Sequence, residues 1–131
     1  MDYYEEFAFG DNPKMADELL SLVLAGKKTA TTSAMPEYEL ENDRIPKVGD
    51  VSLVLDGAGK PACVIETKCV TVLPFKDVTW EMAKREGEDT VMESWREHHT
   101  SFFTRNAAKY GYAFSEDMIV VFEEFAVTEI L

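Results

Sequence analysis

The segment Gly26 to Ser33, GKKTATTS, places two lysines and four hydroxyl residues in eight positions. A threonine hydroxyl is a weak nucleophile that needs a base within hydrogen-bond reach. A lysine can act as that base when burial removes its charge, or it can remain charged and stabilise a developing oxyanion. Two solvated lysines at a helix end are the alternative, because cations also interact favourably with the helix dipole there. The segment therefore predicts either a ligand-binding corner or a polar surface turn.

The spacing of these residues limits which side chains can act together. Successive side chains of a strand point to opposite faces, so Lys28 and Thr31 meet only if the strand is bulged or if Lys28 still belongs to the turn. Thr29 and Thr31 share one face of a regular strand. By the two-residue period of a strand alone, Thr32 is the better partner of Lys28, because the two side chains then lie on the same face.

Residues further along the chain add candidates. Glu86 is either a solvated residue at a helix end or a carboxylate of the same site. Trp95 and Arg96 can stack on a nucleobase and hydrogen-bond to it, although Trp95 also fits an apolar core stripe. His99 follows one turn later, where it is expected to pack or hydrogen-bond near the pocket. His98 and His99 lie about 100° apart on a helix, which is not the i, i+4 pair of a two-histidine metal site. We expect no metal and no cofactor.

The first half of the chain predicts one helix, one strand and a loop. Asn12 and Pro13 suit an N-cap and a first helical position, apolar residues then recur at helical spacing, and Gly26 ends the helix. Residues 29–33 favour a strand because threonine is β-branched. Residues 34–47, which are polar and contain two prolines, predict a long surface loop.

The second half predicts further strands and two helices. Residues 49–75 have the pattern of two or three strands. Thr79 can cap a short helix, and the Thr90-x-x-Glu93 capping box predicts the start of a longer helix that Gly111 ends. The run MIVVFEEFAVTEI predicts a closing strand. Strands that follow one another, with helices between and beside them, indicate an α+β fold built on a small, mainly antiparallel β-barrel.

Composition narrows the class of protein. The 131 residues, 46% of them hydrophobic, fit a single domain over residues 1–131. A net charge of −12 argues against a protein held to nucleic acid mainly by phosphate contacts, and it favours a small ligand. The acidic N-terminus and the lack of a long apolar run predict a cytoplasmic protein without a membrane partner. Cys63 and Cys69 belong to one predicted strand, too far apart for a disulfide.

Four ordered motifs together resemble the ASCH domain: LAGKKTATTS, AKREGE, SWREHHTSFF and VVFEEFAV. Within that family the chain is similar to a longer branch with the pattern Trp-Arg-x-x-His-x-x-Phe-Phe. The resemblance covers nearly the whole chain. It implies a PUA-like barrel, a pocket beside the Gly-x-Lys turn, and binding of RNA or of modified nucleosides.

One branch of the family comprises acetylcytidine amidohydrolases, whose motifs are Lys-Thr-x-Thr and a later Ala-x-x-Glu. Here Lys28-Thr29-Ala30-Thr31 matches the first motif and Ala83-Lys84-Arg85-Glu86 the second. The resemblance therefore implies Lys28, Thr31 and Glu86 as catalytic residues. We expect Lys27, Thr29, Trp95, Arg96 and His99 to bind the substrate. Ser33 stands where that branch has arginine, which leaves both the substrate and the reaction open.

Two mechanisms fit these residues. In one, neutral Lys28 is the base and Glu86 handles the leaving group; in the other, Glu86 is the base and charged Lys28 stabilises the oxyanion. The sequence predicts a hydrolase of the amidohydrolase type acting on an acylated or modified nucleoside. The alternative is a non-catalytic RNA- or nucleotide-binding module.

Overall fold

The fold is built on one five-stranded sheet. The computed structural model describes residues 2–131, and its strands are β1 (Glu5–Phe7), β2 (Ala30–Ala34), β3 (Val51–Leu55), β4 (Pro61–Pro74) and β5 (Ile119–Ile130). The strand order is β1-β3-β4-β5-β2, in which β1 runs parallel to β3 and the other neighbours are antiparallel. The predicted α+β fold with a mainly antiparallel barrel-like sheet is confirmed.

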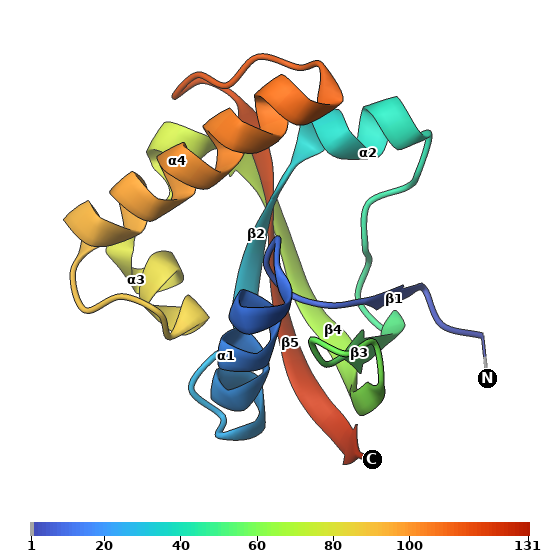
Figure 1. Ribbon diagram of the computed structural model, residues 1–131. Coiled ribbons are helices and arrows are strands. Elements are labelled where there is room, and N and C mark those ends of the chain that lie inside the picture. The colour runs from blue at the N-terminus through green and yellow to red at the C-terminus, as the bar shows by residue number, and fades with distance from the viewer. Residues whose placement is uncertain (1) are drawn as a thin grey trace.

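The sheet curls into a half-barrel around its two longest strands (Figure 1). β4 and β5 pair from Cys63↔Ile130 to Pro74↔Ile119, and the register shifts twice along the way. Each bulge bends the strand and increases its twist, which lets the long hairpin-like pair curve. β1 and β2 stand at the two ends of the strand order, so the opening of the half-barrel lies between them.

The helices begin and end largely where local chemistry predicts. They are α1 (Pro13–Leu24), α2 (Met35–Glu41), α3 (Trp80–Ala83) and α4 (Met92–Tyr110), with 3-10 turns η1 (Phe75–Asp77) and η2 (Lys84–Glu86). The Asn12 side chain accepts a hydrogen bond from the Met15 amide at 2.9 Å, which confirms the predicted N-cap of α1. The Thr79 hydroxyl accepts from the Met82 amide at 3.3 Å, and Gly111 ends α4 with a φ of 86°.

Three local predictions are wrong. The threonines after Gly26 are expected to form the first strand, but they form the second, because β1 precedes them and pairs with β3. Residues 35–41 of the predicted loop form α2, since a proline is tolerated in the first turn of a helix. The N-cap of α4 is Val91, without a side-chain cap, so the Thr90-x-x-Glu93 capping box does not form.

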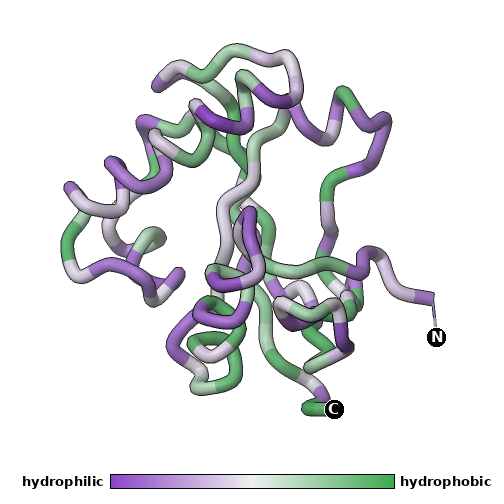
Figure 2. Tube along the Cα trace, viewed as in Figure 1, coloured by the Kyte–Doolittle hydropathy of each residue, from purple (hydrophilic) through white to green (hydrophobic). Residues whose placement is uncertain are grey.

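Two apolar clusters hold the helices on the sheet. Under α4, buried Trp95 and Phe103 pack with Phe75 and Val120. Under α1, buried Leu20 and Val23 pack against β3, β4 and β5, and burying one side chain of that size contributes about 1.5–3 kcal/mol. Hydrophobic residues run along the middle of the sheet, whereas the helices alternate hydrophilic and hydrophobic residues (Figure 2).

Two further expectations concern cysteines and membranes. Cys63 and Cys69 are both free thiols of β4, as the strand assignment predicts. Within residues 2–131, no helix has the length and apolar character required to span a bilayer.

Candidate functional site

The end of α1 directs Lys28 into the protein interior. Gly26 adopts a left-handed φ of 75°, and the amides of Lys27 and Lys28 both donate to the Leu22 carbonyl, at 2.9 and 3.1 Å. The chain reverses sharply at this point, as a glycine after a helix end permits. The Lys28 side chain therefore lies beneath the surface, and the residue is only 2% exposed.

The segment around η2 packs directly against this turn. The Thr29 amide donates to the Arg85 carbonyl at 2.8 Å. Gly87 has a φ of 73°, and a Cβ atom added there would lie 2.3 Å from the Lys27 carbonyl oxygen. Only glycine allows so close a backbone approach. This contact places Glu86 beside Lys28.

The Glu86 carboxylate accepts four hydrogen bonds. Its Oε1 atom faces Lys28 Nζ at 3.4 Å and His99 Nε2 at 3.2 Å. Its Oε2 atom accepts from the Thr32 hydroxyl at 2.7 Å and from the Trp95 indole at 3.0 Å. All the acceptor positions of this buried carboxylate are therefore filled.

The charges around Glu86 determine its protonation. Burial alone raises the pKa of the Glu86 carboxyl, but the Lys28 ammonium, His99 and the Thr32 hydroxyl outweigh it and lower the pKa from 4.5 to about 2. Glu86 is therefore a carboxylate at neutral pH, with a low affinity for protons.

His99 carries the second positive charge of the cluster. Its Nδ1 atom lies 2.9 Å from the Trp95 carbonyl and its Nε2 atom faces Glu86, so both ring nitrogens meet acceptors and both must donate. Burial lowers the pKa of His99, but the Glu86 carboxylate outweighs burial and raises it above the usual value. The ring also stacks on Trp95, with 4.1 Å between centroids.

Lys28 has no free donor. Its ammonium donates to the Ala30 carbonyl at 3.0 Å, to Glu86 at 3.4 Å and to Glu88 Oε2 at 2.7 Å. Two cations, Lys28 and His99, thus face two carboxylates, Glu86 and Glu88. Such balance is what makes buried charge tolerable, because an unpaired buried ion is strongly destabilising.

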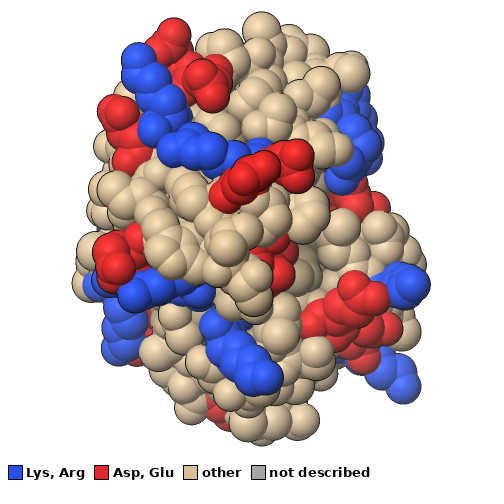
Figure 3. All heavy atoms as spheres, turned by 90° about the vertical axis from the view of Figure 1, so that its left-hand side faces the viewer, with Lys and Arg blue, Asp and Glu red and all other residues tan. Residues whose placement is uncertain are grey.

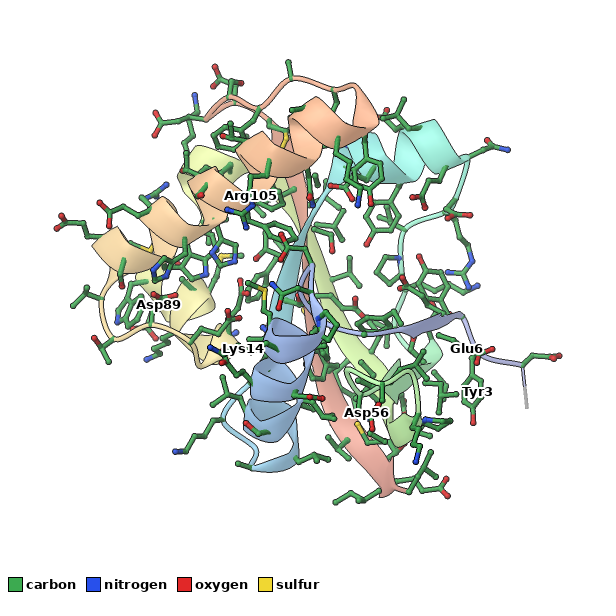
Figure 4. All side chains as sticks on the ribbon, viewed as in Figure 1. Tyr3, Glu6, Lys14, Asp56, Asp89 and Arg105 are labelled. Carbon is green, nitrogen blue, oxygen red and sulfur yellow. The ribbon has the colours of Figure 1, made fainter. Side chains whose placement is uncertain are left out.

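The cluster forms one wall of a cavity of about 620 Å³, a size typical of small-molecule sites. The polar wall consists of Lys28, Thr31, Thr32, Glu86, Glu88 and His99. The apolar wall comes from α1 and from the loop before it. Exposed Arg105 of α4 borders the cavity and donates to Asp11 at 3.2 Å, which ties α4 to that loop (Figure 4).

A second cavity of about 580 Å³ lies at the opening of the half-barrel, lined by residues of β1, β2 and α2. The two cavities share Phe9, Gly10, Thr31, Thr32 and Phe102. Thr31 therefore stands at the boundary between the two cavities, and only the first contains the Lys28 cluster.

A family model for the ASCH domain matches residues 5–129. The chain belongs to the ASCH domain family. No curated protein matches the sequence of this ASCH domain.

Solved structures agree with this assignment. The ASCH domain is similar to a protein from Enterococcus faecalis V583, at 34% identity and a TM-score of 0.91, over 96% of this chain and 77% of that one. It is also similar to an ASCH domain from Lactobacillus crispatus JV V101, at 31% identity and a TM-score of 0.88, over 95% of this chain and 80% of that one. An ASCH protein from Zymomonas mobilis, solved as a Tyr-to-Phe mutant, is 10% identical with a TM-score of 0.51, over 83% of this chain and 63% of that one, and shares the fold alone.

The ASCH domain brings some of the sequence-predicted residues together. Lys28, Thr31, Glu86 and His99 all line the first cavity. Trp95 lies behind them, fully buried, where its indole donates to Glu86 and its ring stacks on His99. Its packing in the core excludes stacking on a ligand.

Three other predicted residues lie elsewhere. Lys27 is exposed on the turn and does not line the cavity. The Thr29 hydroxyl donates to the Arg85 carbonyl at 3.3 Å, so it fastens the two segments. Arg96 donates to the carbonyls of Lys76 and Val78 and does not line the cavity.

Sequence reasoning missed Glu88 and His98 as members of the site. Glu88 directly follows Gly87, the glycine that makes the close backbone contact. This position next to the glycine was the signal that the sequence offered for Glu88. His98 was considered only as a metal ligand; no group of three or more metal-binding side chains occurs in the described part of the chain. Thr32 was favoured by the strand period, and it is the threonine whose hydroxyl bonds to Glu86.

Proposed function

We propose that this ASCH domain is a hydrolase of the amidohydrolase type that acts on an acylated or modified nucleoside. One observation carries the proposal: Lys28, Thr31 and Glu86, which come from two distant segments, line the same cavity. A hydroxyl, a buried cation and a carboxylate are the parts that acyl transfer requires.

The contacts favour the role that Lys28 has in the second mechanism, a charged group that stabilises the oxyanion, but they do not favour Glu86 as the base. Its ammonium touches two carboxylates, and neighbouring negative charge stabilises the protonated form. Glu88 is the partner that a substrate can replace, because its side chain is 27% exposed whereas that of Glu86 is 2% exposed. A substrate carbonyl oxygen that takes the place of Glu88 accepts a hydrogen bond from the Lys28 ammonium. The positive charge of the ammonium then stabilises the oxyanion as it forms.

Thr31 or Thr32 supplies the nucleophilic hydroxyl in this proposal. Thr31 is partly exposed in the cavity, whereas Thr32 is 7% exposed and already bonded to Glu86. The greater access of Thr31 favours it. Glu86 then acts mainly by holding Lys28, His99 and Thr32 in position.

The test is to incubate the purified protein with nucleosides acylated on the base nitrogen, acetylcytidine among them, and to follow free nucleoside by chromatography. Turnover by the wild type that disappears in Lys28→Met, under conditions where circular dichroism shows that the variant is still folded, supports the hydrolase. The matched control is Lys84→Met, since Lys84 is exposed and pairs with exposed Glu81. No product from any member of the panel would exclude the proposed reaction.

The alternative function is non-catalytic binding of a nucleotide or of RNA. The saturated hydrogen bonds of Lys28 and Glu86 favour it, because they leave neither group free to activate a nucleophile. Long RNA is the less favoured ligand, since Arg85 pairs with Glu124 at 2.7 Å and basic groups lie beside acidic ones on the face shown in Figure 3. Nucleoside binding without turnover, insensitive to salt, would select this alternative over the hydrolase.

A further inference from the structure

His98 lies next to the buried cluster but takes no part in it. The side chain is 69% exposed, lines the same cavity as Lys28, and faces Asp89 with 2.8 Å between Nδ1 and Oδ1. Asp89 lies in the segment that leads into α4, beside the helix that carries His98 (Figure 4). An exposed imidazole on the cavity wall thus has a buried carboxylate behind it.

The Asp89 carboxylate fixes the tautomer of the His98 ring. Its side chain is only 3% exposed, and its Oδ2 atom is buried without a hydrogen-bond partner among residues 2–131. The carboxylate accepts the Nδ1–H of His98, and this assigns the other ring nitrogen, Nε2, as the free position. A histidine oriented by a carboxylate, with Nε2 unengaged, is the arrangement that proton transfer to a substrate requires.

The buried cluster itself offers no suitable base. Glu86 accepts four hydrogen bonds, Lys28 has three acceptors for its three donors, and both nitrogens of His99 are engaged. A carboxylate stabilised by two cations is a weak proton acceptor. The charged and titratable groups that line the cavity together with His98 are Glu18, Lys28, Glu86, Glu88, His99 and Arg105.

We propose that His98, oriented by Asp89, is the general base and acid of the hydrolytic reaction in this cavity. The inference rests on the hydrolase proposed above and adds to it the group that moves the proton. Asp89 is a positioning residue in this scheme.

The proton balance with Thr31 as nucleophile is as follows. His98 Nε2 takes the hydroxyl proton as Thr31 Oγ1 bonds to the acyl carbon, and the carbonyl electron pair moves to an oxygen that faces Lys28. The carbon–nitrogen bond then breaks, its electron pair goes to nitrogen, and Nε2–H gives its proton to that nitrogen. The products are the free nucleoside and an acyl ester on Thr31.

The second half returns the protein to its starting state. Nε2 takes a proton from water as the water oxygen bonds to the acyl carbon. The bond from carbon to Thr31 Oγ1 breaks, and Nε2–H returns its proton to Oγ1. Amide and water become amine and carboxylic acid, and His98 ends neutral.

A purely structural role for the pair would tie the segment before α4 to the helix. Kinetics separate the two roles: His98→Ala should lower kcat by roughly 10²–10⁴-fold, with KM changed little, and added imidazole should restore part of the rate. If the pair has only a structural role, His98→Ala would instead lower the stability of the fold, and added imidazole would not restore the rate. Asp89→Asn should lower kcat in the same direction and shift the pH dependence of kcat/KM.

The matched control is Glu97→Gln, an exposed neighbour on α4 that does not line the cavity. Each variant is checked by circular dichroism and by its unfolding midpoint. If wild type is active, Lys28→Met is inactive and His98→Ala keeps full activity with an unchanged pH profile, the role of His98 is wrong while the hydrolase stands. If the wild type turns over no acylated nucleoside, the hydrolase and this inference fall together.

Discussion

The Lys28 ammonium and the Glu86 carboxylate lie 3.4 Å apart, although 58 residues separate them in the sequence. Their meeting depends on the backbone contact between the turn after α1 and the segment after η2. Both side chains are almost completely buried, and each has further partners of its own. The pair is therefore part of the framework of the site as well as a candidate for its chemistry.

Removal of Lys28 should destabilise the fold. Lys28→Met leaves Glu88 without its cation and Glu86 with His99 alone, and breaking a buried charge pair typically costs about 3–5 kcal/mol. Lys84→Met should change the free energy of unfolding by less than about 0.5 kcal/mol, because that exposed pair contributes little. Urea denaturation measures both free energies of unfolding. Equal, small losses of stability in the two variants would contradict a buried network of ion pairs around Lys28.

The two threonines should differ in their effects on activity and stability. Thr31→Val is expected to abolish turnover and leave stability nearly unchanged, because its side chain is partly exposed. Thr32→Val removes a hydrogen bond to the buried Glu86 carboxylate, which costs about 1.5–3 kcal/mol of stability. Product chromatography together with urea denaturation distinguishes them. Turnover retained in Thr31→Val and lost in Thr32→Val would transfer the nucleophile to Thr32.

Glu88 should compete with the substrate for Lys28. Glu88→Gln removes one of two carboxylates on the ammonium, so a substrate carbonyl meets a stronger positive field and binds more tightly, by roughly tenfold or about 1.4 kcal/mol. Isothermal titration with the nucleoside measures the change. Glu81→Gln, which alters an exposed ion pair, is the control; weaker binding in Glu88→Gln would instead assign Glu88 to direct ligand contact.

The close approach at Gly87 should be sensitive to a single methyl group. Gly87→Ala combines a left-handed φ with a 2.3 Å contact to the Lys27 carbonyl, whereas Gly59→Ala has a φ of 83° and no atom within 4 Å. Gly59→Ala is expected to cost about 1–2 kcal/mol. Gly87→Ala should cost clearly more and should also reduce activity. Equal losses of stability in the two variants would show that the segments are not in tight contact.

The charge of His99 should make stability depend on pH. Its folded-state pKa lies above its usual 6.5, so its contribution is fully present below that pH and is lost as pH rises through the folded value. The chain has two histidines, so NMR can follow each ring separately. His99 should titrate above 6.5, and Glu86→Gln should lower its midpoint. A His99 midpoint below 6.5 would mean that burial outweighs the Glu86 carboxylate.

The sequence determined the local elements and most of the candidate residues. The helix from Pro13, its cap and its glycine end follow from side chains within a few positions of one another. The family motifs led to Lys28 and Glu86, and the period of two led from Lys28 to Thr32. These features depend on neighbours in the chain, which a sequence shows directly.

Only the tertiary structure decided how the residues act. β1 is a three-residue strand whose pairing with β3 depends on a distant segment, and α2 forms although prolines suggested a loop. The engagement of every donor on Lys28 and every acceptor position on Glu86 arises from three separate segments of the chain. Long-range packing sets burial, and burial sets charge and proton affinity, so the sequence could name the ionisable groups but not which of them is free to transfer a proton.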